Sequence, residues 1–239
     1  MPAADDLKAF ARTCGADLVG IADLALFREE RFCIPGDLLE PYAYAVSVAC
    51  RLDDPILDRI ADHPTPEYAD HYRAVNAGLD RITAGLVGWI SGQGFRGHAV
   101  PASFITDEKI LMGNVSHKAI ARMAGIGWQG KSLLIVTPEH GPRIRLATVL
   151  TDMPLVPDGP IKSRCGKCME CSRACPAEAI KGVLPKGERY SERDEALFFA
   201  KCAEKTLEFK AMAGIGARIC GVCVKACPHG RKNASRSKV

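Results

Sequence analysis

The sequence predicts an α/β (α+β) body followed by a small cysteine-rich domain. Helical and strand patterns alternate up to about residue 157, prolines and glycine then gather in MPLVPDGP, and eight of the 11 cysteines lie after residue 160. We therefore expect one domain over residues 1–157 and a second over residues 158–239, which ends in a basic tail.

The first domain is expected to alternate helices and short strands. A helix over residues 5–14 is stopped by Gly15, and apolar patterns predict strands in DLVGIA, AYAVSVACRL, FRGHAV, SLLIVT and IRLATVLT. SHKAIARMAG is expected to be helical. A long helix over residues 67–91 carries an apolar stripe at helical spacing, which we interpret as core: Val75, Leu79, Ile82, Leu86 and Ile90.

Composition indicates an ordinary cytoplasmic protein. Apolar residues make up 47% of the chain, no run approaches about 18 consecutive apolar residues, and the start MPAADDLKAF lacks a basic segment followed by an apolar one. Neither a membrane span nor a membrane partner is therefore expected. The formal net charge of +4 is concentrated in the tail RKNASRSKV, which we interpret as a solvated end. In a reducing compartment, clustered cysteines more often ligate metal than form disulfides.

The first cysteine run has the spacing of a 4Fe-4S cluster site. CGKCMECSRACP places four cysteines in the order CxxCxxCxxxCP, which bacterial ferredoxins use: Cys165, Cys168, Cys171 and Cys175. Structural zinc is the alternative, but zinc sites use paired CxxC units and need neither the third cysteine nor the closing proline.

A second run, CGVCVKACP, supplies three more cysteines, and the expected helix over residues 191–212 carries Cys202, which can complete the set. In two-cluster ferredoxins, the fourth cysteine of a run ligates the other cluster. One predicted ligand set is therefore Cys165, Cys168, Cys171 and Cys227. The other is Cys175, Cys202, Cys220 and Cys223. Two clusters of charge about −2 each would offset the formal +4. We expect the remaining cysteines to be buried free thiols: Cys14, Cys33 and Cys50.

The segment GIGWQGKS matches both the GxxxxGK[ST] and the GxGxxG nucleotide-binding patterns. A phosphate loop follows a strand and opens a helix, because the helix N-terminus holds the phosphate. Here a helical pattern comes first and the strand SLLIVT follows. We therefore interpret both matches as coincidental.

The segment HKAIARMAGIGWQGKSLLIVTPEHGPRIRLATVLTDMPL, followed by the two cysteine runs, resembles the cobalamin-dependent epoxyqueuosine reductase family. The resemblance is clearest over residues 118–228 and is greatest to short, double-cluster forms, since only 11 residues follow Pro228 where long members carry a helical-repeat domain that engages tRNA. It implies a nitroreductase-like body that binds cobalamin, and a ferredoxin-like domain with two 4Fe-4S clusters. The loop residues implied to line the corrin are Gly127, Trp128, Gly130, Lys131 and Ser132.

The proton donor is less well defined. Family members carry an Asp three residues before a proline ahead of the loop, and the corresponding position here is His98, which could deliver a proton near neutral pH. The weaker candidates are His71, Tyr72, Asp107 and Glu108.

The resemblance implies an oxidoreductase that passes electrons through two clusters to a corrinoid, and then to a substrate that need not be epoxyqueuosine-tRNA. The alternatives are an electron-transfer protein that delivers low-potential electrons to a partner, such as a corrinoid protein under reactivation, and a flavin-containing reductase. The implied partners are a ferredoxin- or flavodoxin-type electron donor and a small-molecule or corrinoid substrate; tRNA stays open.

Overall fold

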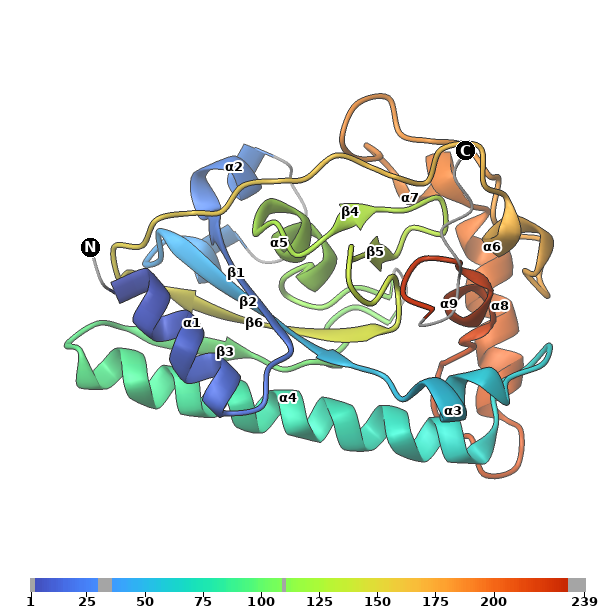
Figure 1. Cartoon of the computed structure of the whole chain (residues 1–239), viewed down its shortest axis with the longest axis horizontal. Helices are drawn as coiled ribbons and strands as arrows, with labels where there is room; N and C mark the ends of the chain where they lie inside the picture. The colour runs from blue at the N-terminus through green and yellow to red at the C-terminus, as the bar shows by residue number, and fades with distance from the viewer. Residues whose placement is uncertain (1–2, 30–35, 109–110, 232–239) are drawn as a thin grey trace. The chain divides into compact units, whose positions relative to one another are not determined.

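A computed structural model describes residues 3–29, 36–108 and 111–231 (Figure 1). The helices are α1 (Ala3–Thr13), α2 (Leu24–Glu29), α3 (Asp54–Asp58), α4 (Pro66–Gly92), α5 (His117–Met123), α6 (Glu170–Arg173), α7 (Arg193–Ala196), α8 (Phe199–Lys210) and α9 (Val222–Ala226), with a 3-10 turn over Gly36–Leu39. The strands are β1 (Leu18–Asp23), β2 (Tyr44–Arg51), β3 (Gly97–Val100), β4 (Trp128–Gln129), β5 (Ile135–Val136) and β6 (Ile144–Thr151).

The chain packs as two compact units. The first contains residues 1–50, 75–127 and 145–161, and the second contains residues 51–74, 128–144 and 162–239. The second unit thus combines the whole cysteine-rich segment with two segments from before residue 157. The division at residue 157 into a cofactor-binding domain and an iron-sulfur domain stays a prediction.

A four-stranded sheet in the order β1-β2-β6-β3 forms the centre of the first unit. β1 pairs antiparallel with β2, so that Ile21 lies opposite Val46, and β3 pairs antiparallel with β6, so that His98 lies opposite Leu150. The pairing confirms the mixed α/β body expected from the sequence.

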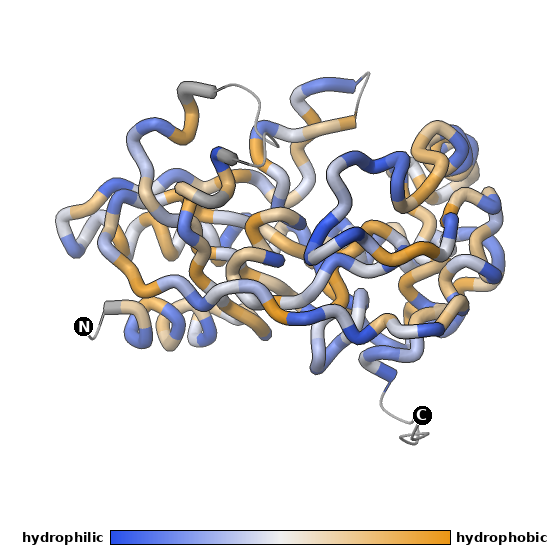
Figure 2. The backbone as a smooth tube through the Cα atoms, turned by 90° about the horizontal axis from the view of Figure 1, so that it is seen from above, coloured by the Kyte–Doolittle hydropathy of each residue, from blue (hydrophilic) through white to orange (hydrophobic). Residues whose placement is uncertain are grey.

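Helices cover both faces of this sheet. The apolar stripe of α4 is buried in one core with Leu7 of α1, Val48 of β2 and Val149 of β6. Figure 2 shows hydrophilic and hydrophobic residues alternating along α1, as this packing requires. On the other face α5 packs on β1, as Figure 1 shows above the sheet. The core interpretation of the stripe is therefore confirmed.

Gly20 of β1 is the point of closest approach between the sheet and α5. A Cβ atom there would lie 2.0 Å from the carbonyl oxygen of Ala124, at the end of α5. We expect Gly20→Ala to destabilise the protein by about 2 kcal/mol, since overpacking against the backbone of Ala124 forces that backbone to move.

The matched control is Gly88→Ala on an exposed part of α4, where no atom lies within 4 Å of the added Cβ. It should stabilise by roughly 0.5–1 kcal/mol through helix propensity. Chemical unfolding of both variants measures the difference, and equal stabilities would contradict the steric argument.

The expected helix over residues 191–212 is two helices. Leu197 is extended, with φ −154° and ψ 157°, and forms a bridge with Ile180, while the N–H of Phe198 donates to the carbonyl of Ala179 at 2.8 Å. These pairings to a distant segment interrupt the helix, so the prediction of one continuous helix was wrong. Cys202 keeps its predicted helical position, in α8.

The expected strand SLLIVT is reduced to Ile135–Val136, which pairs with Trp128–Gln129 as a short hairpin. GIGWQGKS therefore follows α5 and enters a hairpin, which confirms the predicted order of helix, loop and strand. Among the described residues, no helix has the length and apolar composition needed to cross a membrane.

Candidate functional site

The first cysteine run winds through a turn and a short helix. The N–H of Cys168 donates to the carbonyl of Cys165 at 3.1 Å, and Cys171 lies within α6. The N–H of Cys175 donates to the carbonyl of Ser172 at 3.3 Å. Gly166 allows the first turn because its φ is +49°. The spacing of two residues is thus used to turn successive cysteines around one centre.

The second run turns at Gly221, whose φ is +82°. A Cβ atom at this position would lie 2.5 Å from Cδ1 of Ile60, so the run also passes close to the segment before α4 within the second unit. α9 then leads to Cys227 in extended backbone. This glycine therefore meets both a conformational and a packing requirement.

Four thiols lie close enough to interact electrostatically, and we call them the first group: Cys165, Cys168, Cys171 and Cys227. Burial raises the pKa of Cys227 to about 12, and the nearby thiolates of Cys165, Cys171 and Cys168 add to the shift. Burial also raises the pKa of Cys171, and the charges of Cys165 and Cys168 raise it further. These four cysteines are the set that the sequence assigns to one cluster.

The remaining four thiols form a second group. Burial raises the pKa of Cys220 to about 11, and the charges of Cys202 and Cys175 add to the shift. Burial raises the pKa of Cys223 well above its usual value, followed by the charges of Cys220, Cys202, Cys171 and Cys175. Since Cys171 belongs to the first group, the two groups are neighbours.

Two groups of four thiols meet the ligand requirement of two 4Fe-4S clusters, since each cluster takes four thiolates. A tetrahedral zinc ion needs four ligands at one centre, whereas each thiolate of a cubane binds a different iron and lies farther from the others. Iron would also offset the mutual repulsion of the buried thiolates. The residues present therefore fit two 4Fe-4S clusters.

The GIGWQGKS loop lies against the first group. Trp128 is buried and donates from Nε1 to Sγ of Cys165 at 3.4 Å, and Lys131 is buried and donates from Nζ to the carbonyl oxygen of Cys168 at 2.9 Å. Gly130 allows this approach: a Cβ atom there would lie 2.7 Å from Cγ2 of Val136. Trp128 and Lys131 thus have partners that the sequence reasoning did not foresee.

Ser132 and Gly127 are the other two loop residues predicted to line the corrin. Ser132 is half-buried, and Gly127 ends the segment of the first unit that precedes the hairpin. The corrin-lining role of the five loop residues stays a prediction.

His98, the predicted proton donor, is exposed on β3, where its ring lies 6.3 Å from that of Tyr42. His71 accepts from the N–H of Asp53 at 2.9 Å. Tyr72 contacts Tyr68 edge-on, and Asp107 bridges Met112. None of these contacts tests a catalytic role, which stays a prediction for His98.

His117 was missed because its pattern, a histidine at a helix start, is not distinctive. Its Nδ1 lies 2.8 Å from Oγ1 of Thr148 and its Nε2 lies 3.0 Å from the carbonyl oxygen of Pro101. Burial lowers the pKa of His117 to about 4, so the ring is neutral at pH 7 and holds α5 to β6.

The cysteines outside the two groups differ from expectation. Cys14 is exposed, in the turn that follows α1, so its prediction as a buried thiol was wrong. Cys50 is half-buried, and burial raises its pKa to about 11. Cys33 lies outside the described residues, as does the basic tail beyond Arg231.

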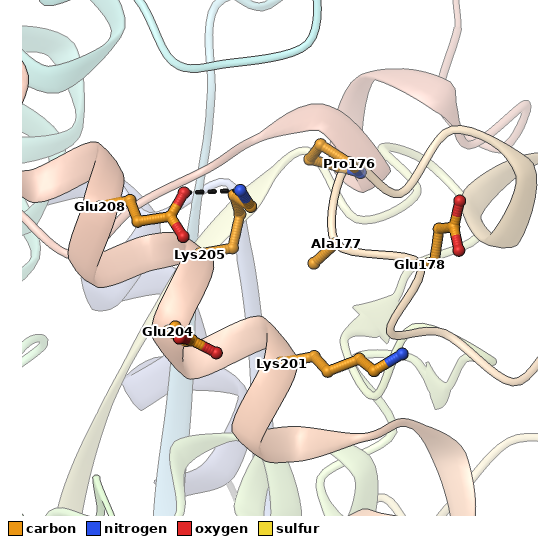
Figure 3. Close-up of a pocket in the computed structure, with 7 residues that line it drawn as sticks. All are labelled: Pro176, Ala177, Glu178, Lys201, Glu204, Lys205 and Glu208. Atoms are coloured by element: carbon orange, nitrogen blue, oxygen red, sulfur yellow. Dashed lines mark hydrogen bonds and ion pairs between the residues drawn. The ribbon is translucent and has the colours of Figure 1, made fainter.

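An open polar hollow of about 330 Å³ lies between α8 and the segment 176–178 (Figure 3). It is lined by Pro176 and Glu178, which follow Cys175, and by Lys201 and Lys205 of α8, the helix that carries Cys202. Lys205 pairs with Glu208, one turn along α8, at 2.5 Å. The hollow is thus lined by residues that follow Cys175 in sequence and by the helix that carries Cys202.

The fold and the cysteine groups define a double-cluster iron-sulfur protein with a mixed α/β body. Residues 164–230 match the family model of a 4Fe-4S double cluster binding domain, which confirms the prediction of two clusters.

Comparisons with known proteins extend the resemblance to the rest of the chain. An epoxyqueuosine reductase of Listeria monocytogenes is 33% identical over 121 residues, which are 50% of this chain and 31% of that protein. A reductive dehalogenase structure, described as suggesting a mechanism for B12-dependent dehalogenation, matches with a TM-score of 0.71 and 22% identity over 95% of this chain and 31% of that one. An epoxyqueuosine reductase of Bacillus subtilis matches with a TM-score of 0.61 and 23% identity over 95% of this chain and 65% of that one.

The chain is thus related to the epoxyqueuosine reductases and shares its fold with them and with reductive dehalogenases. It matches about a third of the length of the Listeria relative.

Proposed function

We propose that this chain is an iron-sulfur reductase in which two 4Fe-4S clusters pass electrons to a bound acceptor and from there to a substrate. One observation carries the proposal: eight cysteines form two neighbouring groups of four, within a segment that matches a double cluster binding domain. Neighbouring clusters form a path for single electrons, and a lone structural metal would not need two such groups.

The first cluster would be held by Cys165, Cys168, Cys171 and Cys227. The second would be held by Cys175, Cys202, Cys220 and Cys223. The electrostatic neighbours of Cys227 and Cys220 support this crossed assignment, because each includes cysteines from the other run. The crossing would tie both runs into one unit and hold the clusters side by side.

The surroundings of the two groups support a direction of electron flow. The open hollow is lined by residues that follow Cys175 and by α8, which carries Cys202, whereas the buried side chains of Trp128 and Lys131 contact Cys165 and Cys168. Electrons from a ferredoxin- or flavodoxin-type donor would enter at the second cluster and leave from the first.

Cobalamin is the proposed acceptor, held by a nitroreductase-like body. A protein of similar fold is a reductive dehalogenase whose structure is described as suggesting a mechanism for B12-dependent dehalogenation, which supports this assignment. Cobalamin would supply a cobalt centre that accepts electrons at low potential. The loop residues proposed to line the corrin are Gly127, Trp128, Gly130, Lys131 and Ser132, of which Trp128 and Lys131 also contact the first cysteine run. The substrate is proposed only as a small molecule or a corrinoid, with epoxyqueuosine-tRNA as one candidate.

Anaerobic reconstitution tests this function. The purified chain should bind about eight iron atoms, as two 4Fe-4S clusters require, and should then retain one cobalamin per chain through gel filtration. Visible spectra and EPR would report both groups, and the matched control is the same protein incubated with cobalamin before iron and sulfide are added.

Clusters without retained cobalamin would overturn the reductase proposal in favour of an electron-transfer protein. A retained flavin in place of cobalamin would overturn it in favour of a flavin-containing reductase.

A further inference from the structure

We propose that Trp128 and Lys131 set the reduction potential of the cluster bound by Cys165, Cys168, Cys171 and Cys227, an inference that rests on the proposed function. The two side chains leave the hairpin three residues apart and meet two cysteines that are also three residues apart. Trp128 meets Cys165 and Lys131 meets the backbone of Cys168.

Trp128 donates directly to a ligand sulfur. Its side chain is 1% exposed, and the Nε1–Sγ distance of 3.4 Å is that of an N–H···S hydrogen bond. Reduction adds one negative charge to a cluster, and hydrogen bonds to the cluster sulfurs stabilise that charge, more so where water is excluded. The N–H of Trp128 should therefore raise the reduction potential.

The indole ring of Trp128 contacts Arg164 and His229, which lie close in sequence to two cluster ligands. Its face lies 5.9 Å from the guanidinium of Arg164, which precedes Cys165. The ring of His229, two residues after Cys227, packs against it edge-on with centroids 5.1 Å apart. The donor is thus fixed by residues adjacent in sequence to two ligands.

Lys131 adds a buried positive charge beside the same ligands. It is 5% exposed, and its ammonium contacts the carbonyl oxygen of Cys168 at 2.9 Å and Sδ of Met169 at 3.7 Å. Both partners are neutral, so these contacts offset only part of the cost of burying a charge. A cluster with a net charge of about −2 would do so, and each added electron would strengthen the attraction.

The midpoint potentials of the two clusters test this inference directly. EPR-monitored redox titration of the reconstituted protein should resolve two midpoint potentials. Trp128→Phe removes the N–H and keeps an aromatic ring, and Lys131→Met removes the charge and keeps the stem. In each variant one potential should fall by the equivalent of about a tenfold change in the reduction equilibrium, ~59 mV for one electron, and the other should stay unchanged.

Trp89→Phe is the matched control. Trp89 is half-buried on α4 and stacks on Phe10 within the first unit, so this variant should leave both potentials unchanged. If Trp128→Phe fails to assemble clusters, replacing the indole with benzothiophene keeps the shape and removes only the N–H.

The outcomes separate this inference from the function on which it rests. Wild-type protein that binds no cluster would overturn the proposed function and the inference with it. Intact clusters with unchanged potentials in both variants, or an equal shift in Trp89→Phe, would overturn the inference alone.

Discussion

Replacing Cys175 by alanine should halve the iron content of the reconstituted protein, from about eight atoms per chain to about four, and adding Cys220→Ala should remove no more. The two residues lie in different cysteine runs but in the same electrostatic group, since burial raises the pKa of Cys220 and the charges of Cys202 and Cys175 add to the shift. If both serve one cluster, the second substitution acts on a cluster that is already lost. Iron and acid-labile sulfide analysis, with EPR of the reduced protein, measures the outcome.

A second pair makes the test decisive. Cys171 and Cys175 lie in the same run but in different groups, so Cys171→Ala combined with Cys175→Ala should remove both clusters. The opposite pattern, in which Cys175→Ala with Cys220→Ala loses all iron and Cys171→Ala with Cys175→Ala keeps half, would show that each run binds its own cluster. Cys14→Ala is the control, because Cys14 is exposed and lies outside both groups.

The cluster ligands could be predicted from the sequence because most of the information is local. Each run fixes the relative positions of its cysteines within a dozen residues, and no distant contact is needed to place them. The α4 stripe could be predicted for the same reason, since helical periodicity is a property of one segment.

The features that the sequence did not predict depend on contacts between distant segments. Trp128 lies 37 residues before Cys165, and only the pairing of β4 with β5 turns its indole toward that sulfur. Leu197 follows Glu195 and Ala196, which have high helix propensity, yet its bridge to Ile180 ends α7. In each case a pairing partner outside the local window decided the structure.

The same limit applied to Arg143. It precedes the expected strand IRLATVLT and no sequence pattern marks it, but the structure buries its side chain to 1% exposure. Its Nη1 donates to Asp54 at 3.0 Å and its Nη2 donates to Asp58 at 3.1 Å. Nη2 also contacts the carbonyl oxygen of Lys225 at 3.4 Å, between Cys223 and Cys227. One guanidinium therefore joins α3 to the second cysteine run.

We expect Arg143→Met to destabilise the second unit by about 3 kcal/mol. The substitution preserves most of the volume but removes hydrogen bonds to two carboxylates and a carbonyl, and such bonds to charged groups contribute about 1.5–3 kcal/mol each. Arg51 still pairs with Asp54 in the variant, and Asp58 is 60% exposed, so neither carboxylate is left buried without a partner. This keeps the expected loss at the lower end of the range for a broken buried ion pair.

The substitution should also speed the loss of iron, because Lys225 lies in α9 between the predicted cluster ligands Cys223 and Cys227. Bleaching of the visible cluster absorbance in guanidinium, followed on the reconstituted protein, reports both the midpoint and the rate. Arg59→Met is the matched control: Arg59 pairs with Glu67 at 2.7 Å in the same unit, but its side chain is 67% exposed, and pairs of this kind contribute about 0–1 kcal/mol. Equal bleaching in the two variants would mean that Arg143 fills space in the second unit without holding α3 to the second cysteine run.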